Sequence, residues 1–162
     1  YTAQEAMVLG ADAVVIMIFP GTPDEERSLG RLARLSAECE LLGLPVMAES
    51  IPGGWAQAVP WNAENIGRGA RIAIELGADI VKTLCPFPTD EFYEVIDACP
   101  GPVVALGGPK VDNEDEIVKM AAGVVTAGGA GVAIGRNVWG SENPEGLVRK
   151  LREAVHGSVN DA

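Results

Sequence analysis

The chain has 162 residues, enough for one domain with a hydrophobic core, and its 48% hydrophobic and 22% charged residues are typical of globular proteins. Its formal net charge of −11 argues against a general surface for nucleic acid or for an anionic membrane. No run of eighteen apolar residues is present, so we expect no membrane-spanning helix, and the three cysteines without CxxC spacing predict a reducing, cytoplasmic setting.

Helical and strand-like patterns alternate along the chain. In chain order we expect helices over 2–10, 23–43, 62–77, 89–98, 113–129 and 143–157, with strands over 13–19, 45–50, 80–84, 102–108 and 131–136. Thr2 and Thr89 are the expected caps of the helices that they begin. The joint from helix to strand is nearly repeated, as LGADAVVI at 9–16 and LGADIVKT at 76–83, and a glycine closes each helix.

The alternation predicts an α/β fold built from βα repeats. Each expected strand is a continuous apolar run, which is typical of a parallel sheet buried on both faces. A complete (βα)8 barrel usually needs at least about 200 residues, whereas this chain has 162. Two architectures therefore remain open from the pattern: an open five-stranded sheet of flavodoxin type, or part of a (βα)8 barrel.

Lys82 lies in the middle of the apolar run 80–84. Side chains alternate along a strand, so Lys82 shares a face with Ile80 and Leu84, the face that would line a barrel. Burial of an ammonium ion is costly unless it is paired or loses its proton, and a neutral amine is a nucleophile for carbonyl groups. One interpretation is therefore a Schiff-base lysine. The other is a lysine at a strand end that reaches solvent or pairs with an acid.

Glycine-rich turns follow the last two expected strands, GGPK at 107–110 and GRN at 135–137. Glycines let backbone N–H groups approach an anion closely, and the start of a following helix adds its dipole. Arg136 can bind phosphate oxygens through two hydrogen bonds, and loops after strands seven and eight of (βα)8 enzymes commonly form a phosphate site. The turns thus favour phosphate binding over plain glycine-rich connections. The predicted phosphate ligands are Gly107, Gly108, Gly135 and Arg136.

The motifs GADIVKT, PVVALGGPK and AGGAGVAIGRNVWG resemble the archaeal-type class I fructose-bisphosphate aldolase family, within the wider group of DeoC and FbaB-like aldolases. Their order and spacing match from about Thr2 to His156. The resemblance implies a (βα)8 TIM barrel whose sixth strand carries the Schiff-base lysine, which falls on Lys82, and it implies that the glycine turns bind substrate phosphate. It also implies that strands one to three, with a catalytic aspartate on the first, are missing. Residues 1–162 would then form a single aldolase-type domain of about strands 4–8.

One motif departs from the family pattern. The family's fifth strand usually ends in Tyr-Pro-Arg-Gly, where the tyrosine assists proton transfer, whereas this chain has Ile51 and Gly53 at the positions of the tyrosine and the arginine. Glu49 is the nearest substitute, since a carboxylate can orient the ammonium group or move protons. A solvent-facing acid at a strand end is the other interpretation of Glu49. A zinc-dependent class II aldolase is excluded, because the chain has one histidine and such a site needs several.

The sequence thus predicts a class I aldolase-like enzyme that needs no metal or organic cofactor. Lys82 and Glu49 would be catalytic, and the substrate would be a phosphorylated ketose or aldehyde. The alternatives are a phosphosugar-binding or purely structural relic without catalysis, and a transaldolase-like or thiolase-like transferase on the same scaffold. Because the end strands of an incomplete barrel have open edges, we expect a homo-oligomer or a partner chain that supplies strands one to three.

Overall fold

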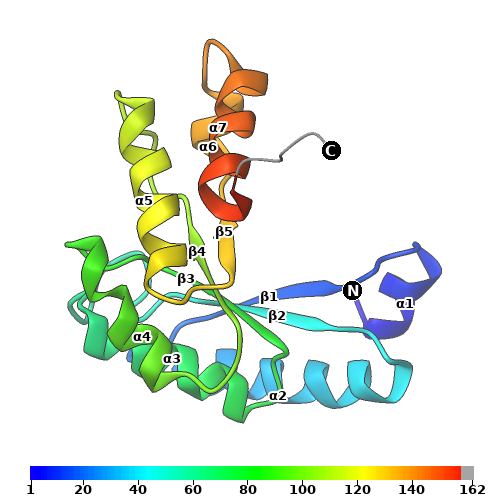
Figure 1. Cartoon of the computed structure of the whole chain (residues 1–162). Coiled ribbons are helices and arrows are strands. Elements are labelled where there is room, and N and C mark those ends of the chain that lie inside the picture. The colour runs from blue at the N-terminus through cyan, green and yellow to red at the C-terminus, as the bar shows by residue number, and fades with distance from the viewer. Residues whose placement is uncertain (158–162) are drawn as a thin grey trace.

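The computed structural model describes residues 1–157, so residues 158–162 of the expected domain lie outside the described part. It shows a parallel five-stranded sheet in the order β1-β2-β3-β4-β5 (Figure 1). The strands are β1 (Val14–Ile18), β2 (Val46–Ser50), β3 (Ile80–Thr83), β4 (Val103–Leu106) and β5 (Gly131–Ala133). The helices are α1 (Ala3–Val8), α2 (Glu25–Leu42), α3 (Ala63–Glu75), the 3-10 turn η1 (Thr89–Glu91), α4 (Phe92–Ala98), α5 (Glu114–Thr126), α6 (Arg136–Trp139) and α7 (Pro144–His156). None of the helices within the described residues is both long and apolar enough to cross a membrane.

Among residues 1–157, the helices cover one face of the sheet only. The helix α2 packs against β1 and β2, α3 against β2 and β3, and α5 against β4 and β5, all outside the curve of the sheet (Figure 1). Val46, Ala48 and Ser50 are buried, whereas Met47 and Glu49, which point to the other face, are partly exposed. The expectation of a sheet buried on both faces is therefore wrong for residues 1–157. The inner face is open, and β1 and β5 form the two edges that the sequence predicts.

The repeated joint between helix and strand is built as the sequence predicts. Gly10, Gly77 and Gly128 follow α1, α3 and α5 with φ angles of 79°, 93° and 94°, a conformation that glycine adopts without a steric cost. Thr2 caps α1 as expected, because its hydroxyl accepts a hydrogen bond from the Glu5 N–H while the Glu5 carboxylate accepts one from the Thr2 N–H. The near-repeat in the sequence thus corresponds to a repeat in the structure.

Several expected element ends lie elsewhere in the structure, and two of these differences change the type of an element. Thr89 does not cap an α-helix, because the chain leaves the extended Pro88 into the tighter 3-10 turn η1 and α4 begins only at Phe92. The last strand is also shorter than expected, since its pairing with β4 ends at Leu106 and Ala133. It ends there because β4 itself stops before the glycines at 107 and 108 and offers no further partner. Arg136 consequently begins α6 instead of ending a strand.

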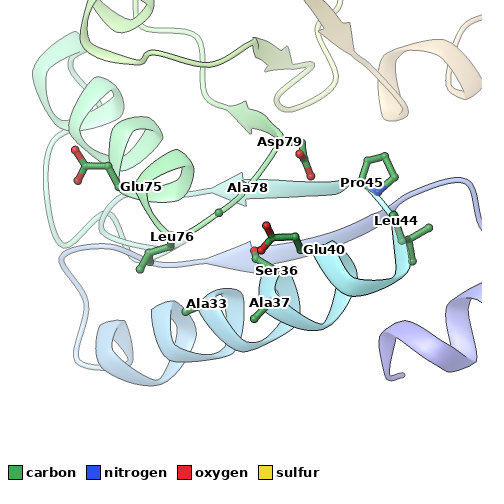
Figure 2. Close-up of a pocket in the computed structure, with 12 residues that line it drawn as sticks. Ala33, Ser36, Ala37, Glu40, Leu44, Pro45, Glu75, Leu76, Ala78 and Asp79 are labelled. Carbon is green, nitrogen blue, oxygen red and sulfur yellow. The ribbon is translucent and has the colours of Figure 1, made fainter.

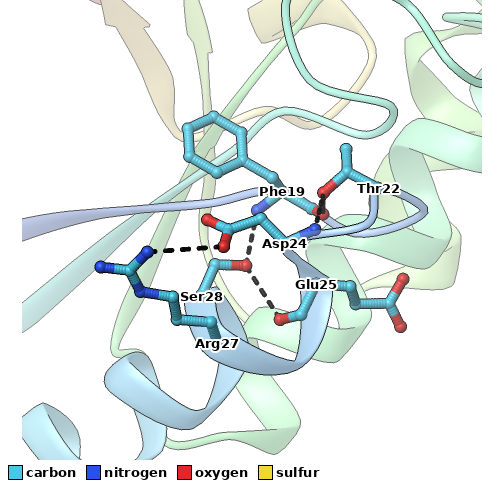
Figure 3. A network of polar contacts seen from close by, with 6 residues as sticks. All are labelled: Phe19, Thr22, Asp24, Glu25, Arg27 and Ser28. Carbon is cyan, nitrogen blue, oxygen red and sulfur yellow. Dashed lines mark hydrogen bonds and ion pairs between the residues drawn. The ribbon is translucent and has the colours of Figure 1, made fainter.

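A polar network joins the end of β1 to the start of α2 (Figure 3). The Phe19 N–H donates a 3.2 Å hydrogen bond to Ser28 Oγ, and the Ser28 hydroxyl donates a 3.0 Å bond to the Glu25 carbonyl. The Thr22 hydroxyl donates a 2.8 Å bond to the Phe19 carbonyl. Partly buried backbone groups need such partners, so the network fixes this loop at the carboxyl end of the sheet.

Gly30 and Gly69 form a matched pair of helix glycines with opposite surroundings. An added Cβ at Gly30, inside α2, would have no heavy atom within 4 Å, whereas at Gly69, inside α3, it would lie 2.8 Å from Ser50 Oγ and 2.9 Å from Pro52 Cγ. Gly30→Ala is expected to raise the free energy of unfolding by about 0.5–1 kcal/mol through helix propensity. Gly69→Ala is expected to lower it by about 1–3 kcal/mol through steric overlap. Urea denaturation measures both, and a gain in stability from Gly69→Ala would contradict the close packing of α3 on β2.

Candidate active site

A row of side chains crosses the open face of the sheet. The strand register aligns Met17 with Glu49, Glu49 with Lys82, and Lys82 with Val104. Lys82 Nζ lies 3.0 Å from Glu49 Oε1, and the lysine and glutamate side chains are 23% and 16% exposed. The two residues that the sequence marks as candidate catalytic groups are therefore in direct contact, on the face that no described helix covers.

This contact bears on both interpretations of Lys82. The lysine is paired with an acid, as the second interpretation requires. The same pairing also fits the first interpretation, because an ammonium group must give up its proton before it can attack a carbonyl, and the Glu49 carboxylate is a proton acceptor within reach. Glu49 is mostly buried against its neighbours and is not the solvent-facing acid that was the alternative for this residue.

Two side-chain hydrogen bonds help to fix the register between β2 and β3. At the amino end of β3, the Asp79 carboxylate accepts a 2.8 Å hydrogen bond from the Val46 N–H. At the carboxyl end, the buried Thr83 hydroxyl donates a 2.8 Å hydrogen bond to the Ser50 carbonyl. A slip of one residue would move every side chain of a strand to the other face. The two bonds therefore help to keep Lys82 on the open face.

The two glycine turns also meet. The Arg136 guanidinium donates a 3.1 Å hydrogen bond to the Gly108 carbonyl, and the Asn137 side-chain amide donates a 2.9 Å bond to the Gly107 carbonyl. Gly107, Gly108, Gly135 and Arg136 thus lie in one region at the carboxyl ends of β4 and β5. Sequence reasoning missed Asn137, which is only 4% exposed. Its one signal was its place in the GRN motif, directly after Arg136.

The helix dipole that the sequence suggested at these turns has little support. The helix α5 begins at Glu114, separated from Gly108 by residues 109–113, and its first turn holds three acids, Glu114, Asp115 and Glu116. Negative charges at this position oppose an anion. The helix α6 has four residues, too few for a substantial dipole. Anion binding here would therefore depend on backbone N–H groups and on Arg136.

Ile51 and Gly53 occupy the positions at which the resemblance implies a tyrosine and an arginine, and neither contributes a side chain to the row on the open face. Ile51 is fully buried in the hydrophobic core, so its side chain does not reach the open face. Gly53 has a φ angle of 71°, and an added Cβ would lie 2.4 Å from the backbone nitrogen of Val59. No larger residue fits this conformation of the loop. Glu49 is thus the titratable group of β2 that contacts Lys82.

Cys85 follows the end of β3 in the loop that leads to η1. It lines a groove of 650 Å³ at the carboxyl ends of β3 and β4, together with Trp61, Gly107 and Gly108 among others. Burial raises the pKa of the Cys85 thiol, although a hydrogen bond with Thr89 acts in the opposite direction. A raised pKa keeps the thiol protonated at neutral pH, so Cys85 is poorly suited to act as a nucleophile.

A second groove, of 790 Å³, lies at the amino ends of β2 and β3 (Figure 2). Three acids line it: Glu40 from α2, Glu75 at the end of α3, and Asp79 from the turn before β3. In (βα)8 barrels the chemistry takes place at the carboxyl ends of the strands, and the amino-end loops serve stability. This groove is therefore separate from the candidate site. Within residues 1–157, no three His, Cys, Asp or Glu side chains gather closely enough to hold a metal ion.

Comparison with known proteins identifies the family. The family model described as DeoC/LacD family aldolase matches residues 1–141. The chain belongs to this family. The resemblance seen in the motifs around Lys82 and the two glycine turns is therefore confirmed at the level of the family.

Among curated relatives, 2-amino-3,7-dideoxy-D-threo-hept-6-ulosonate synthase 1 of Archaeoglobus fulgidus is 36% identical over 159 residues, which cover 98% of this chain and 58% of the relative. A crystal structure of an archaeal fructose 1,6-bisphosphate aldolase is 36% identical, with a TM-score of 0.89, over 98% of this chain and 63% of that one. A further structure is of an archaeal fructose-1,6-bisphosphate aldolase with the catalytic lysine covalently bound to the carbinolamine intermediate of the substrate. It is 35% identical, with a TM-score of 0.85, over 95% of this chain and 62% of that one.

The chain therefore spans about three fifths of the length of the relatives that it matches, 58% in one case and 63% in another. Five parallel strands that alternate with helices correspond to that share of a (βα)8 barrel. The prediction of a partial TIM barrel is confirmed, and the open sheet of flavodoxin type is excluded.

Cys85 offers a test of the chemistry assigned to this end of the sheet. Because burial raises the pKa of its thiol, alkylation by iodoacetamide at neutral pH is expected to be slower in the folded protein than in the urea-unfolded chain. The half-maximal rate is expected at a higher pH in the folded protein, since only the thiolate reacts. Peptide mapping after timed quenching measures the alkylation rate of Cys85 and its dependence on pH. Rapid alkylation of folded Cys85 at neutral pH would instead indicate an activated thiol.

Proposed function

We propose that the protein uses Lys82 as a Schiff-base nucleophile to break or form a C–C bond in a phosphorylated ketose or aldehyde. The observation that carries this proposal is the contact of 3.0 Å between Lys82 Nζ and Glu49 on the open face of the sheet. Membership in an aldolase family supports it, as does the lysine-bound intermediate of an archaeal aldolase that is 35% identical to this chain.

The reaction would begin when Glu49 takes a proton from the Lys82 ammonium group. The neutral amine then attacks the carbonyl carbon of the substrate to form a carbinolamine, which loses water to give an iminium ion. In the cleavage direction, a base takes the proton of the hydroxyl group on the carbon that will leave, and that carbon departs as an aldehyde, the first product. The electron pair of the breaking C–C bond moves into the iminium and gives an enamine. Protonation and hydrolysis of the enamine release the second product and restore Lys82, and condensation follows the same steps in reverse.

The substrate phosphate would bind at the two glycine turns. Their closeness supports this part of the proposal, since Arg136 reaches from one turn to the Gly108 carbonyl of the other at 3.1 Å. Backbone N–H groups of Gly107, Gly108 and Gly135 are the expected partners of the phosphate oxygens, with the Arg136 guanidinium supplying positive charge. Such a site would hold the phosphate of a substrate at the carboxyl end of the sheet. It would lie next to β4, the neighbour of the strand that carries Lys82.

A second candidate function is phosphosugar binding without turnover. The buried Ile51 and the sterically confined Gly53 favour it, because the positions that carry a tyrosine and an arginine in the family hold neither here. Within the catalytic candidate, the relative from Archaeoglobus fulgidus is named as a synthase, which favours C–C bond formation or transfer alongside aldol cleavage. Covalent trapping separates non-covalent binding from Schiff-base chemistry, because borohydride fixes an imine to the lysine, whereas a non-covalently bound sugar leaves no adduct on the protein.

We also propose a cytoplasmic location, supported by the free thiols of Cys39, Cys85 and Cys99. Fractionation of the source cells with a tagged protein tests this, and recovery outside the cytoplasmic fraction would contradict it.

Lys82 is expected to form a reducible adduct. Borohydride treatment in the presence of a panel of phosphorylated ketoses and aldehydes should add one substrate mass to the protein, as intact mass spectrometry records. Lys82→Met should abolish the adduct, whereas the matched control Lys150→Met, which removes an exposed lysine of α7 paired with Asp115, should retain it. Glu49→Gln should slow adduct formation by about 10²-fold or more, the range for loss of a general base. An undiminished yield in Lys82→Met would show that the assignment is wrong.

Arg136→Ala is expected to weaken the binding of phosphorylated ligands by about 1.5–3 kcal/mol, the range for a hydrogen bond to a charged group. The matched control is Arg149→Ala, which removes an exposed arginine paired with Glu145 on α7. Isothermal titration calorimetry measures the affinity of each variant for the phosphorylated and the unphosphorylated form of one sugar. An equal loss for both sugars, or an equal loss in the control, would contradict a role of Arg136 in phosphate binding.

The chain is expected to self-associate or to pair with a chain that supplies the preceding strands. Its edge strands β1 and β5 have one open side each, and Val15, aligned with Met47 on the open face, is 60% exposed. Unpaired edges and exposed apolar faces promote association. Light scattering on the purified 162-residue chain tests this. A compact monomer at micromolar concentration with a cooperative melt would contradict it.

A further inference from the structure

Asn137 is a buried polar side chain between the two glycine turns. It lies on the short helix α6 directly after Arg136 and is 4% exposed. Its amide nitrogen donates hydrogen bonds to the Gly107 carbonyl at 2.9 Å and to the Pro109 carbonyl at 3.1 Å, and its amide oxygen accepts one from the Val111 N–H at 2.9 Å. One side chain thus holds three backbone groups of the opposite turn.

The amide is matched to this task by its chemistry. A carboxamide has two N–H donors and one carbonyl acceptor at a fixed spacing, and all three functions are used here. An aspartate of the same shape would keep the acceptor but would set a carboxylate against the Gly107 and Pro109 carbonyls. A leucine would leave three backbone groups without a partner. The position therefore requires an amide, a stronger constraint than filling space would impose.

Two further contacts join the same turns. Arg136 donates to the Gly108 carbonyl, and the Lys110 ammonium group donates to the Gly140 carbonyl just after α6. Among residues 1–157, the Gly108 and Gly135 N–H groups donate to no protein acceptor. The carbonyls of the first turn are thus occupied by side chains of the second, while the two glycine N–H groups stay available to an external acceptor.

We propose that Asn137 is a positioning residue that holds the two glycine turns together as one anion-binding unit. This inference rests on the proposed phosphate site and adds a residue that would not touch the phosphate itself. Its role is to set the distance between the Gly108 and Gly135 N–H groups, so that both can donate to the same anion.

The first test compares anion affinity in Asn137→Asp with that of the unmodified full chain. Inorganic sulfate is the probe, because it stays divalent across the pH range used, and inorganic phosphate is the second probe at neutral pH. Asn137→Asp is expected to bind sulfate at least about tenfold more weakly, since it loses both donors to the first turn. The matched control Asn143→Ala removes an amide cap of α7, whose oxygen accepts from the Gly146 N–H, and should leave the affinity unchanged.

The pH dependence separates positioning from a general loss of structure. In Asn137→Asp the new carboxyl group would face two carbonyl oxygens, which favour its protonated form, and protonation restores one donor. The sulfate affinity of the variant relative to the unmodified chain should therefore recover as the pH falls. Lys110, Asp112, Glu114 and Glu142 line the same groove as Asn137, and with Arg136 they are present in both proteins, so the ratio isolates the effect of position 137.

Hydrogen exchange in the unmodified chain provides a readout that needs no variant. Sulfate is expected to slow exchange of the Gly108 and Gly135 N–H groups by direct contact, and of the Val111 N–H through its bond to Asn137. Protection confined to one turn would show that the two turns do not act as a unit.

The outcomes distinguish this inference from the function on which it rests. If the unmodified chain binds sulfate or phosphate and Asn137→Asp binds it equally well, the positioning role is wrong and the phosphate site stands. If the unmodified chain binds neither anion, the phosphate site fails and the inference fails with it. An equal loss in Asn143→Ala would show that the effect is general destabilisation, which also overturns the inference.

Discussion

The parallel register between β2 and β3 is the constraint on which the candidate site depends. It sets Glu49 beside Lys82, and it is held at one end by the Asp79 carboxylate and at the other by the Thr83 hydroxyl. A shift by one residue would bury the lysine beneath the helices and expose a threonine in its place. The ion pair between Lys82 and Glu49 contributes little to the stability of the fold, because a partly buried ion pair gains electrostatic attraction at the cost of desolvation. Its value lies in placing an amine next to a proton acceptor.

The proposed site draws its residues from two sets of elements. The strands β2 and β3 supply the amine and the carboxylate from the sheet, where side-chain positions are set by backbone hydrogen bonds. The turns after β4 and β5 supply glycine N–H groups and Arg136, and side chains such as Asn137 join these turns. Among residues 1–157, the helices lie on one side of the sheet (Figure 1), and Lys82 contacts Glu49 on the other side, where a ligand can approach. The same openness leaves apolar side chains such as Val15 exposed, which links the accessibility of the site to the association of the chain.

Local sequence patterns predicted the elements well where short-range chemistry decides them. The glycines at 10, 77 and 128 and the cap at Thr2 depend on neighbours in sequence, so their positions followed from the residues alone. The end of the last strand could not be predicted from its own residues, because it depends on where its partner β4 stops. The contact of Lys82 with Glu49 was anticipated from the motif, but the register that creates it comes from long-range pairing. Asn137 was missed for the same reason, since its partners lie 26 to 30 residues away in sequence.

The central claim is that Lys82 and the two glycine turns act on one molecule. Borohydride trapping with glyceraldehyde 3-phosphate or with glyceraldehyde, followed by peptide mapping, tests this directly when each reaction is run with and without inorganic phosphate as a competitor. The account predicts that the phosphorylated aldehyde modifies the peptide with Lys82 and spares Lys110, Lys119 and Lys150, and that phosphate suppresses this adduct but leaves the smaller yield from glyceraldehyde unchanged. Modification spread over all four lysines of the chain, or an adduct at Lys82 that phosphate does not suppress, would contradict it.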